Sequence, residues 1–221
     1  MTQINPVSSN EESQEPASVN SGVKRLRGAE RRREIAQTAL RLIGRLGLPG
    51  VSMVRIASDL GISDAALYKH YAAKEDILIA AYDLLAERVF AWIGCGTGSP
   101  ALDRLAVMGR SHAALFSEDL EGFNIPMSQF NVWIPQDGLR VHVDESHRDI
   151  IGAMVQLIEE GKADGSIRRD ADSEVIVSEV YSWIWWEDLS HLRGVDWGTI
   201  ARRSAEMFER ILSEIKVVPA R

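Results

Sequence analysis

A stretch of small, apolar and capping residues at positions 52–74 constrains the fold of this chain more than any other feature. Ser52 and Ser63 are good N-caps for two short helices, and Gly61 separates them. Helices that cross at roughly a right angle over a turn of about three or four residues need a small residue where they touch and a permissive backbone in the turn. Ala57 and Gly61 meet both needs, because they stand four residues apart in the required order. The segment therefore predicts a helix-turn-helix.

The second of these two helices has a side that faces inward and a side that faces solvent. With ~3.6 residues per turn, Leu67 and Tyr71 fall on the inward side, so Ala65 and Lys69 centre the opposite side. Small side chains there allow a helix to approach base edges, and polar flanking side chains can donate hydrogen bonds to phosphates on the groove walls. An ordinary helical hairpin would not need this exposed side, although it would share the apolar packing residues Ile56, Leu60, Ile62 and Leu67.

The charge of the chain is unevenly distributed. The net charge of −7 by itself argues against a nucleic-acid partner. Positions 24–74 nevertheless carry eleven Lys and Arg against four acidic residues, whereas positions 75–221 have a net charge of −11. A basic block joined to an acidic remainder favours a polyanionic partner for the first part and a different partner for the second. Lys24, Arg25 and Arg27 form either an arm that follows the minor groove or a solvated charge run.

A pattern of particular residues extends from position 33 to position 78. Its members are Arg33, Glu34, Ile35, Ala39, Leu42, Gly47, Ser52, Ile56, Ala57, Leu60, Gly61, Ile62, Ser63, Ala66, Leu67, Tyr68, His70, Tyr71, Lys74, Glu75 and Leu78. This pattern resembles the DNA-binding domain of the TetR (tetracycline-repressor) family of transcriptional regulators, and the string from Ile56 to Lys74 is its specific part. Beyond it the chain resembles the family only in length and in its expected number of helices.

The resemblance implies double-stranded DNA as a partner and assigns roles within the motif. Ser52, Tyr68, His70 and Lys74 would contact phosphates, helped by the amide end of the helix that opens at Lys74, and residues 64, 65, 66 and 69 would face the bases. Asp64 either stabilises the positive end of its own helix or accepts a hydrogen bond from cytosine N4. The candidate DNA-binding residues are Ser52, Ser63, Asp64, Ala65, Ala66, Tyr68, Lys69, His70 and Lys74.

The rest of the chain is predicted to be helical. Apolar spacing indicates a helix that starts near Ile35 and stops before Gly47, and a long fourth helix from Lys74 to Ile93. No segment alternates like an amphipathic strand, so we expect an all-α fold. A disordered tail (1–22) would precede a three-helix DNA-binding domain (23–73) and a helical domain (74–221). Further helices are expected at about 100–117, 139–164, 172–193 and 196–215.

The tryptophan-rich segment near position 183 predicts a helix that is buried all round, because its three tryptophans within four residues point in different directions. Such a helix can pack on its own core with one side and on a second subunit with the other. The resemblance implies the same homodimer, built from the last two long helices, although the tryptophans could instead fill the core of one subunit. The candidate interface residues are Trp183, Trp186, Phe208 and Ile211.

The segment 92–157 is rich in large or adaptable side chains that suit the lining of a cavity, with His112 and Asn124 as polar anchors. By the resemblance, a small and largely apolar effector held there would displace the fourth helix and change the spacing of the two recognition helices. The same side chains could equally fill a core. The candidate effector-binding residues are Trp92, His112, Phe116, Phe123, Met127, Phe130, Trp133 and Met154.

Other functions have weaker support. Cys95 is the single cysteine, and His142 and His147 are five apart, which does not place them on one helical face, so neither a metal nor another cofactor is expected. No catalytic motif is present, no apolar run is long enough for a membrane span, and no export signal opens the chain, so we expect a cytoplasmic protein without enzymatic activity. The alternatives to a ligand-responsive regulator are an architectural or division factor that recruits a protein and an enzyme targeted to DNA.

Overall fold

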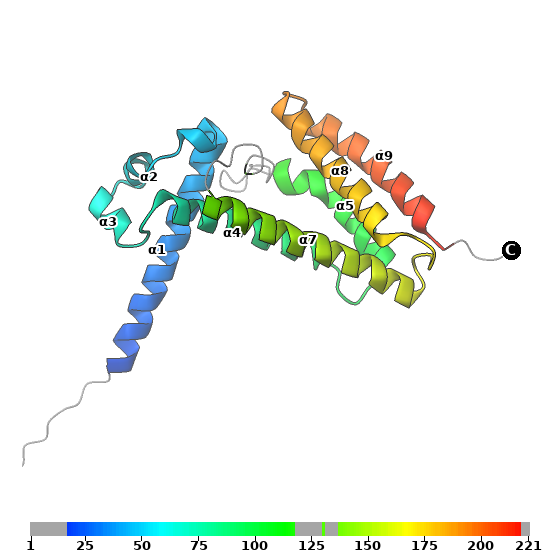
Figure 1. Ribbon diagram of the computed structural model, residues 1–221, viewed down its shortest axis with the longest axis horizontal. Helices are drawn as coiled ribbons and strands as arrows, with labels where there is room; N and C mark the ends of the chain where they lie inside the picture. The colour runs from blue at the N-terminus through cyan, green and yellow to red at the C-terminus, as the bar shows by residue number, and fades with distance from the viewer. Residues whose placement is uncertain (1–16, 118–129, 131–136, 218–221) are drawn as a thin grey trace, which may run out of the picture.

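The computed structural model describes residues 17–117, 130 and 137–217. These residues form helices and no strand, which confirms the predicted all-α fold. Figure 1 shows an elongated arrangement, with α2 and α3 at one end and α8 and α9 at the other. In chain order the elements are α1 (Ala17–Leu46), the 3₁₀ helix η1 (Leu48–Gly50), α2 (Met53–Leu60), α3 (Asp64–Tyr68), α4 (Lys74–Ile93), α5 (Ala101–Ser117), α7 (Asp137–Asp164), α8 (Ser173–Leu192) and α9 (Trp197–Ile215).

The helix α1 is longer than predicted. It begins at Ala17, so residues 17–22, which the sequence assigned to a disordered tail, are helical, and residues 1–16 lie outside the described part of the chain. The physical reason is propagation: the C-terminal half of α1 is fixed by buried side chains such as Ile35 and Ile43, and each further residue then adds one hydrogen bond without a new nucleus. Figure 1 shows the N-terminal half of α1 projecting away from the other helices.

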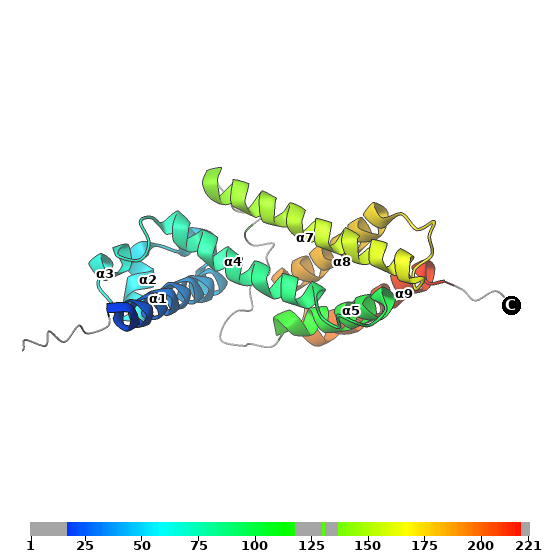
Figure 2. The same cartoon turned by 90° about the horizontal axis from the view of Figure 1, so that it is seen from below.

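The buried side chains form two cores. The first joins α1, η1, α2 and α3 to the N-terminal half of α4 and to Phe130, Leu139 and Val143. The second joins the C-terminal end of α4 to α5, α7, α8 and α9. Figure 2 shows α4 and α7 running along the length of the molecule, and both helices contribute to both cores. The helix α4 packs with the N-terminal core up to Ala86. The predicted domain boundary at Lys74 stays a prediction.

The second core depends on a close approach of α5 to α9. Gly109 of α5 faces Phe208 of α9, and a Cβ atom at position 109 would lie 2.0 Å from the ring atom Cδ1. Phe208 in turn packs on Trp183 of α8, with ring centroids 5.2 Å apart. A glycine is therefore needed at position 109 for the three helices to pack as they do.

Candidate DNA-binding site and C-terminal core

The helix-turn-helix is held by the capping residues that the sequence indicated. The Ser52 hydroxyl accepts a hydrogen bond from the Arg55 amide at 3.3 Å, and the Ser63 hydroxyl accepts one from the Ala66 amide at 3.2 Å. Gly61 ends α2 with a φ of 66°, a left-handed conformation in which a glycine carries no steric penalty. Each short helix thus has a fixed start, and the turn between them has the backbone freedom that it requires.

The exposed side of α3 is the side predicted from helical periodicity. Leu67 is 0% exposed and Tyr71 is 3% exposed, so both pack into the first core. Ala65 and Lys69 are exposed on the opposite side, and Tyr68 beside them is 54% exposed. The nine candidate DNA-binding residues are all at least partly exposed, since Ser63 and Asp64 are exposed as well and the remaining four are half-buried. The buried residues Leu67 and Tyr71 therefore hold α3 against the first core, and its small and polar side chains face outward.

The turn that follows α3 is attached to α1. The Tyr71 hydroxyl donates a hydrogen bond to the Arg32 carbonyl oxygen at 3.1 Å, and the Arg32 guanidinium lies 4.1 Å from the centre of the Tyr71 ring. The same guanidinium donates a hydrogen bond to the His70 carbonyl oxygen. Burial raises the pKa of the Tyr71 phenol, which keeps it protonated as a donor at neutral pH. These contacts fix the position of His70 relative to α1.

The start of α4 lies beside the start of α2. The Lys74 ammonium donates to the Val51 carbonyl oxygen at 3.4 Å, which places it next to Ser52. The Asp76 carboxylate accepts a hydrogen bond from the Ala73 amide at 3.0 Å and so caps α4. The structure therefore brings together Ser52 and Lys74, two of the residues for which the sequence suggested phosphate contacts.

Several arginines of the basic block pair with acidic residues of the chain. Arg31 pairs with Glu34 at 2.8 Å, Arg33 with Glu87 at 3.2 Å and Arg45 with Asp59 at 2.8 Å. These pairs are exposed and add little stability. By contrast, Lys69 makes no ion pair within the part of the chain that the structure describes. The side chains of Lys24 and Arg25 lie outside the described residues, whereas Arg27 borders a groove of about 570 Å³ together with His70.

The helices α4 and α7 connect this surface to the second core. At one end, the Glu75 carboxylate of α4 accepts a hydrogen bond from the Leu139 amide of α7 at 2.8 Å. Further along, the Tyr82 hydroxyl lies 3.2 Å from Nδ1 of His147, and burial raises the pKa of Tyr82. At the far end of α4, Trp92 Nε1 donates to the Met108 carbonyl oxygen at 3.2 Å and to the Ser111 hydroxyl at 3.0 Å. A movement within the second core can therefore reach Lys74 through one continuous helix.

The structure brings three of the candidate effector-binding residues into the second core and separates a fourth. Trp92, His112 and Met154 are buried there, and the Trp92 and His112 rings are 4.9 Å apart. Phe130 is buried in the first core instead, where its ring centroid lies 5.3 Å from that of Tyr82 on α4. The other candidates cannot be placed: the side chain of Phe116 and all of Phe123, Met127 and Trp133 lie outside the described residues, as does the suggested anchor Asn124.

The sequence interpretation missed a buried acidic residue beside His112. Glu187 of α8 is 0% exposed, and its Oε2 contacts Nδ1 of His112. Its other carboxylate oxygen, Oε1, is buried without a hydrogen-bond partner among the described residues. Helical spacing was the available signal, because Glu187 lies four residues after Trp183 and seven after Val180, on the face that both residues bury in the core.

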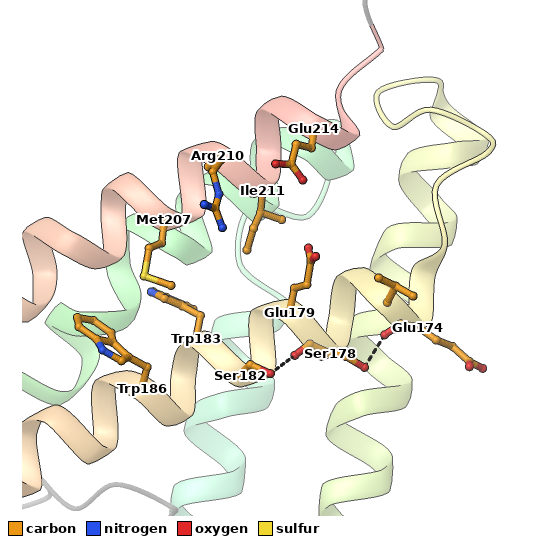
Figure 3. Close-up of a pocket in the computed structure, with 11 residues that line it drawn as sticks. Glu174, Ser178, Glu179, Ser182, Trp183, Trp186, Met207, Arg210, Ile211 and Glu214 are labelled. Atoms are coloured by element: carbon orange, nitrogen blue, oxygen red, sulfur yellow. Dashed lines mark hydrogen bonds between the residues drawn. The ribbon is translucent and has the colours of Figure 1, made fainter.

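The residues suggested for the dimer interface are mostly inside the single chain. Trp183, Phe208 and Ile211 are 1%, 3% and 7% exposed, so their side chains fill the second core and leave little surface for another subunit. Trp186 is half-exposed and lines a groove of about 600 Å³ between α8 and α9 (Figure 3). Figure 3 also shows Met207 and Arg210 of α9 at the same groove. The assignment of these four residues to a dimer interface stays a prediction, because periodicity identifies apolar positions without showing which side of the helix faces its own core.

The described residues contain no group of three or more His, Cys, Asp or Glu side chains that could hold a metal ion. None of the described helices is long and apolar enough to cross a membrane.

This geometry defines a protein class, an all-α helix-turn-helix protein with a helical C-terminal domain, and one family model matches its N-terminal part. Residues 35–81 match the family model described as bacterial regulatory proteins, tetR family. No curated protein sequence matches the chain. The resemblance to the TetR family is thus confirmed, and the chain carries the DNA-binding domain of that family.

Solved structures share the fold over most of the chain. A TetR transcriptional regulator from Chloroflexus aurantiacus has a TM-score of 0.71 and 20% identity, over 87% of this chain and 99% of that one. AibR, solved with isovaleryl coenzyme A and operator DNA, has a TM-score of 0.62 and 22% identity, over 80% and 97%. A transcriptional regulator from Saccharomonospora viridis, solved with choline, has a TM-score of 0.66 and 22% identity, over 86% and 100%. At such identities the likeness establishes the fold.

Proposed function

We propose that this protein is a dimeric transcriptional repressor that binds an inverted-repeat operator and is released by a small, largely apolar molecule bound in its C-terminal core. The observation that carries the proposal is the exposed side of α3, where Ala65, Tyr68 and Lys69 project from a helix fixed by the buried Leu67. Small side chains allow close approach to base edges, and the flanking donors suit phosphates. Regulation by a ligand is supported by the relatives solved with isovaleryl coenzyme A and with choline.

Release would act through α4. This helix starts with Lys74 beside Ser52 and ends with Trp92 hydrogen-bonded to α5. A ligand that fits one arrangement of the second core better than another shifts the population of α4 positions, and with it the distance between the two recognition helices of a dimer. A hundredfold preference would supply about 2.7 kcal/mol of coupling, which is within the usual range for allosteric proteins.

The exposed face of α8 supports the dimer. Val175, Ser182 and Leu189 are exposed and follow one another at intervals of seven residues, and Glu179 and Trp186 repeat the same interval beside them. Val175 is 53% exposed and Leu189 is 57% exposed, although each is a large apolar side chain. A seven-residue repeat on one helical face suits packing against another helix at a shallow angle. We assign this face of α8, together with its groove against α9, as the interface between two copies of the chain.

The direct test is selection of bound sequences from a random DNA pool. A two-fold dimer with one recognition helix per subunit should select an inverted repeat whose half-sites are separated by about one helical turn or a multiple of it. The position of the selected site in the source genome would then indicate the regulated genes. A monomeric protein that selects a single asymmetric site would contradict the proposal.

Lys69→Ala is expected to relax specificity at one position of each half-site. If Lys69 donates to a guanine edge, its loss should weaken binding to the selected site by about 1–3 kcal/mol, that is about 5- to 150-fold. The measurement is binding of both proteins to the selected site and to its single-base variants. An equal loss on every sequence would instead place Lys69 among the phosphate contacts.

Lys74→Ala is expected to weaken binding to all sequences and to reduce the salt dependence of binding. A phosphate contact releases counterions without reading a base, so the slope of log K against log salt should fall by about one for each subunit that loses the contact. Titrations at several salt concentrations on specific and unrelated DNA measure this slope. Normal affinity of the variant at physiological salt would refute the docking of α4 on the phosphates.

A further inference from the structure

We propose that the effector carries a cationic hydrogen-bond donor, a protonated amine, which binds the buried carboxylate of Glu187. This inference rests on the proposed function and specifies the chemistry of its ligand. The sequence predicted a small, largely apolar effector. The effector proposed here has an apolar part and one charged group. The proposal depends on three features of the second core: an unpaired carboxylate oxygen, an excess of buried negative groups, and aromatic rings around them.

The unpaired oxygen is Oε1 of Glu187. The side chain is 0% exposed, so bulk solvent does not reach this atom, and the described residues offer it no hydrogen-bond partner. Its sister oxygen Oε2 is already in contact with Nδ1 of His112. A buried acceptor without a donor costs free energy, and more so when it belongs to a carboxylate. A ligand that brings a donor to Oε1 would remove this cost on binding.

The charges around this oxygen favour a cation over a neutral donor. Among the described residues the buried acidic, basic and histidine side chains are Glu187, Asp188 and His112, with no buried lysine or arginine. The buried groups of the described residues therefore include two carboxylates and no permanent cation. A positive group on the ligand would balance a buried negative charge, whereas a carboxylate ligand would add to it.

Aromatic rings surround the same position. The His112 ring lies between Trp92 and Trp183, with centroid distances of 4.9 Å and 5.1 Å. The faces of such rings attract a cation and also accept an apolar body. Figure 3 shows the indole of Trp183 directed toward Met207 of α9. The site thus suits a molecule with an apolar or aromatic part and one ammonium group.

Occupation of this site would reach the DNA-binding surface. His112 belongs to α5 and its ring packs against Trp92, which stands in the last turn of α4. The first residue of the same helix is Lys74, beside Ser52. A group placed between Glu187 and the rings therefore acts on the end of the helix through which release is proposed to occur.

The test compares three probes that share one apolar body: phenethylamine, 2-phenylethanol and 3-phenylpropionate. Binding is measured by calorimetry and by the shift in Tm for the full chain, for Glu187→Gln and for the matched variant Glu145→Gln, which changes an exposed carboxylate on α7. We expect wild type and Glu145→Gln to bind the amine at least about tenfold more tightly than the other two probes. A tenfold ratio requires only part of the free energy that a buried pair of opposite charges can contribute. Glu187→Gln should lose this preference.

The stability of the unliganded protein gives a second readout that needs no probe. Glutamine keeps an oxygen that can accept from His112 and removes the charge from the buried oxygen that has no donor. The Tm of Glu187→Gln without ligand should therefore be about 2–4 °C higher than that of wild type. A lower Tm would show that the ionic contact with His112 stabilises the core by more than the unsatisfied oxygen costs, and would overturn the proposal. Equal binding of the three probes, or binding of none, would overturn it as well.

Operator binding separates this inference from the function on which it rests. If the amine binds through Glu187 but leaves DNA affinity unchanged, the ligand assignment stands and the release mechanism fails. If a neutral or acidic compound releases the operator while the amine has no preference for wild type over Glu187→Gln, the release mechanism stands and the ligand assignment fails.

Discussion

Leu189→Glu is expected to convert the proposed dimer to a monomer and to weaken operator binding at least about a hundredfold, because linking two half-site contacts in one dimer raises affinity by about 10²–10⁴. Leu189 is 57% exposed on α8 and shares a face with Val175 and Trp186. Two-fold symmetry would bring the new carboxylate into the interface from both subunits. Each would be desolvated without a partner, which makes association unfavourable.

Val141→Glu is the matched control for this substitution. Val141 is 55% exposed, almost as much as Leu189, but it lies on α7 and outside the proposed interface. It should leave the mass in solution and the operator affinity unchanged. Sedimentation velocity and DNA titration of both variants provide the measurement. A dimeric Leu189→Glu protein with normal affinity would move the interface away from α8.

The DNA-binding half was readable from the sequence because its determinants are local. Ser52, Ser63 and Gly61 act within one turn of their own positions, so the caps and the break of the helix-turn-helix follow from residue chemistry alone. The exposed side of α3 follows from helical periodicity once Leu67 and Tyr71 are known to face inward. The family model over residues 35–81 covers the same segment.

The C-terminal half was less predictable because its interactions connect distant parts of the chain. His112 and Glu187 are in contact across 75 positions, and neither position shows by itself that it has such a partner. The apolar residues of α8 surround the helix, so the sequence could not decide that Trp183 faces its own core whereas Leu189 faces solvent. The helices themselves were found by periodicity, but their relative placement requires tertiary contacts that no single window of sequence contains.

Gly109→Val is expected to destabilise the second core by about 3 kcal/mol, at the upper end of the usual cost of overpacking. A Cβ atom at this position would lie 2.0 Å from Cδ1 and 2.2 Å from Cγ of Phe208, and both belong to a rigid ring. Phe208 is itself 3% exposed and packed on Trp183, so it has little room to move. The helices α5 and α9 would therefore have to separate. A loss of this size lowers Tm by about 6–12 °C in a domain of this length.

Gly152→Val separates this steric effect from the helix propensity of valine. Gly152 lies within α7, is exposed, and has no heavy atom within 4 Å of the position that its Cβ would take. Both substitutions exchange the same residue types in a helix, so propensity contributes nearly equally to the two variants. Gly152→Val should change the free energy of unfolding by no more than about 0.5 kcal/mol. Similar Tm values for the two variants would mean that the packing of α5 on α9 does not depend on a close approach at Gly109. The aromatic packing of Phe208 on Trp183 would then tolerate a larger separation of the two helices.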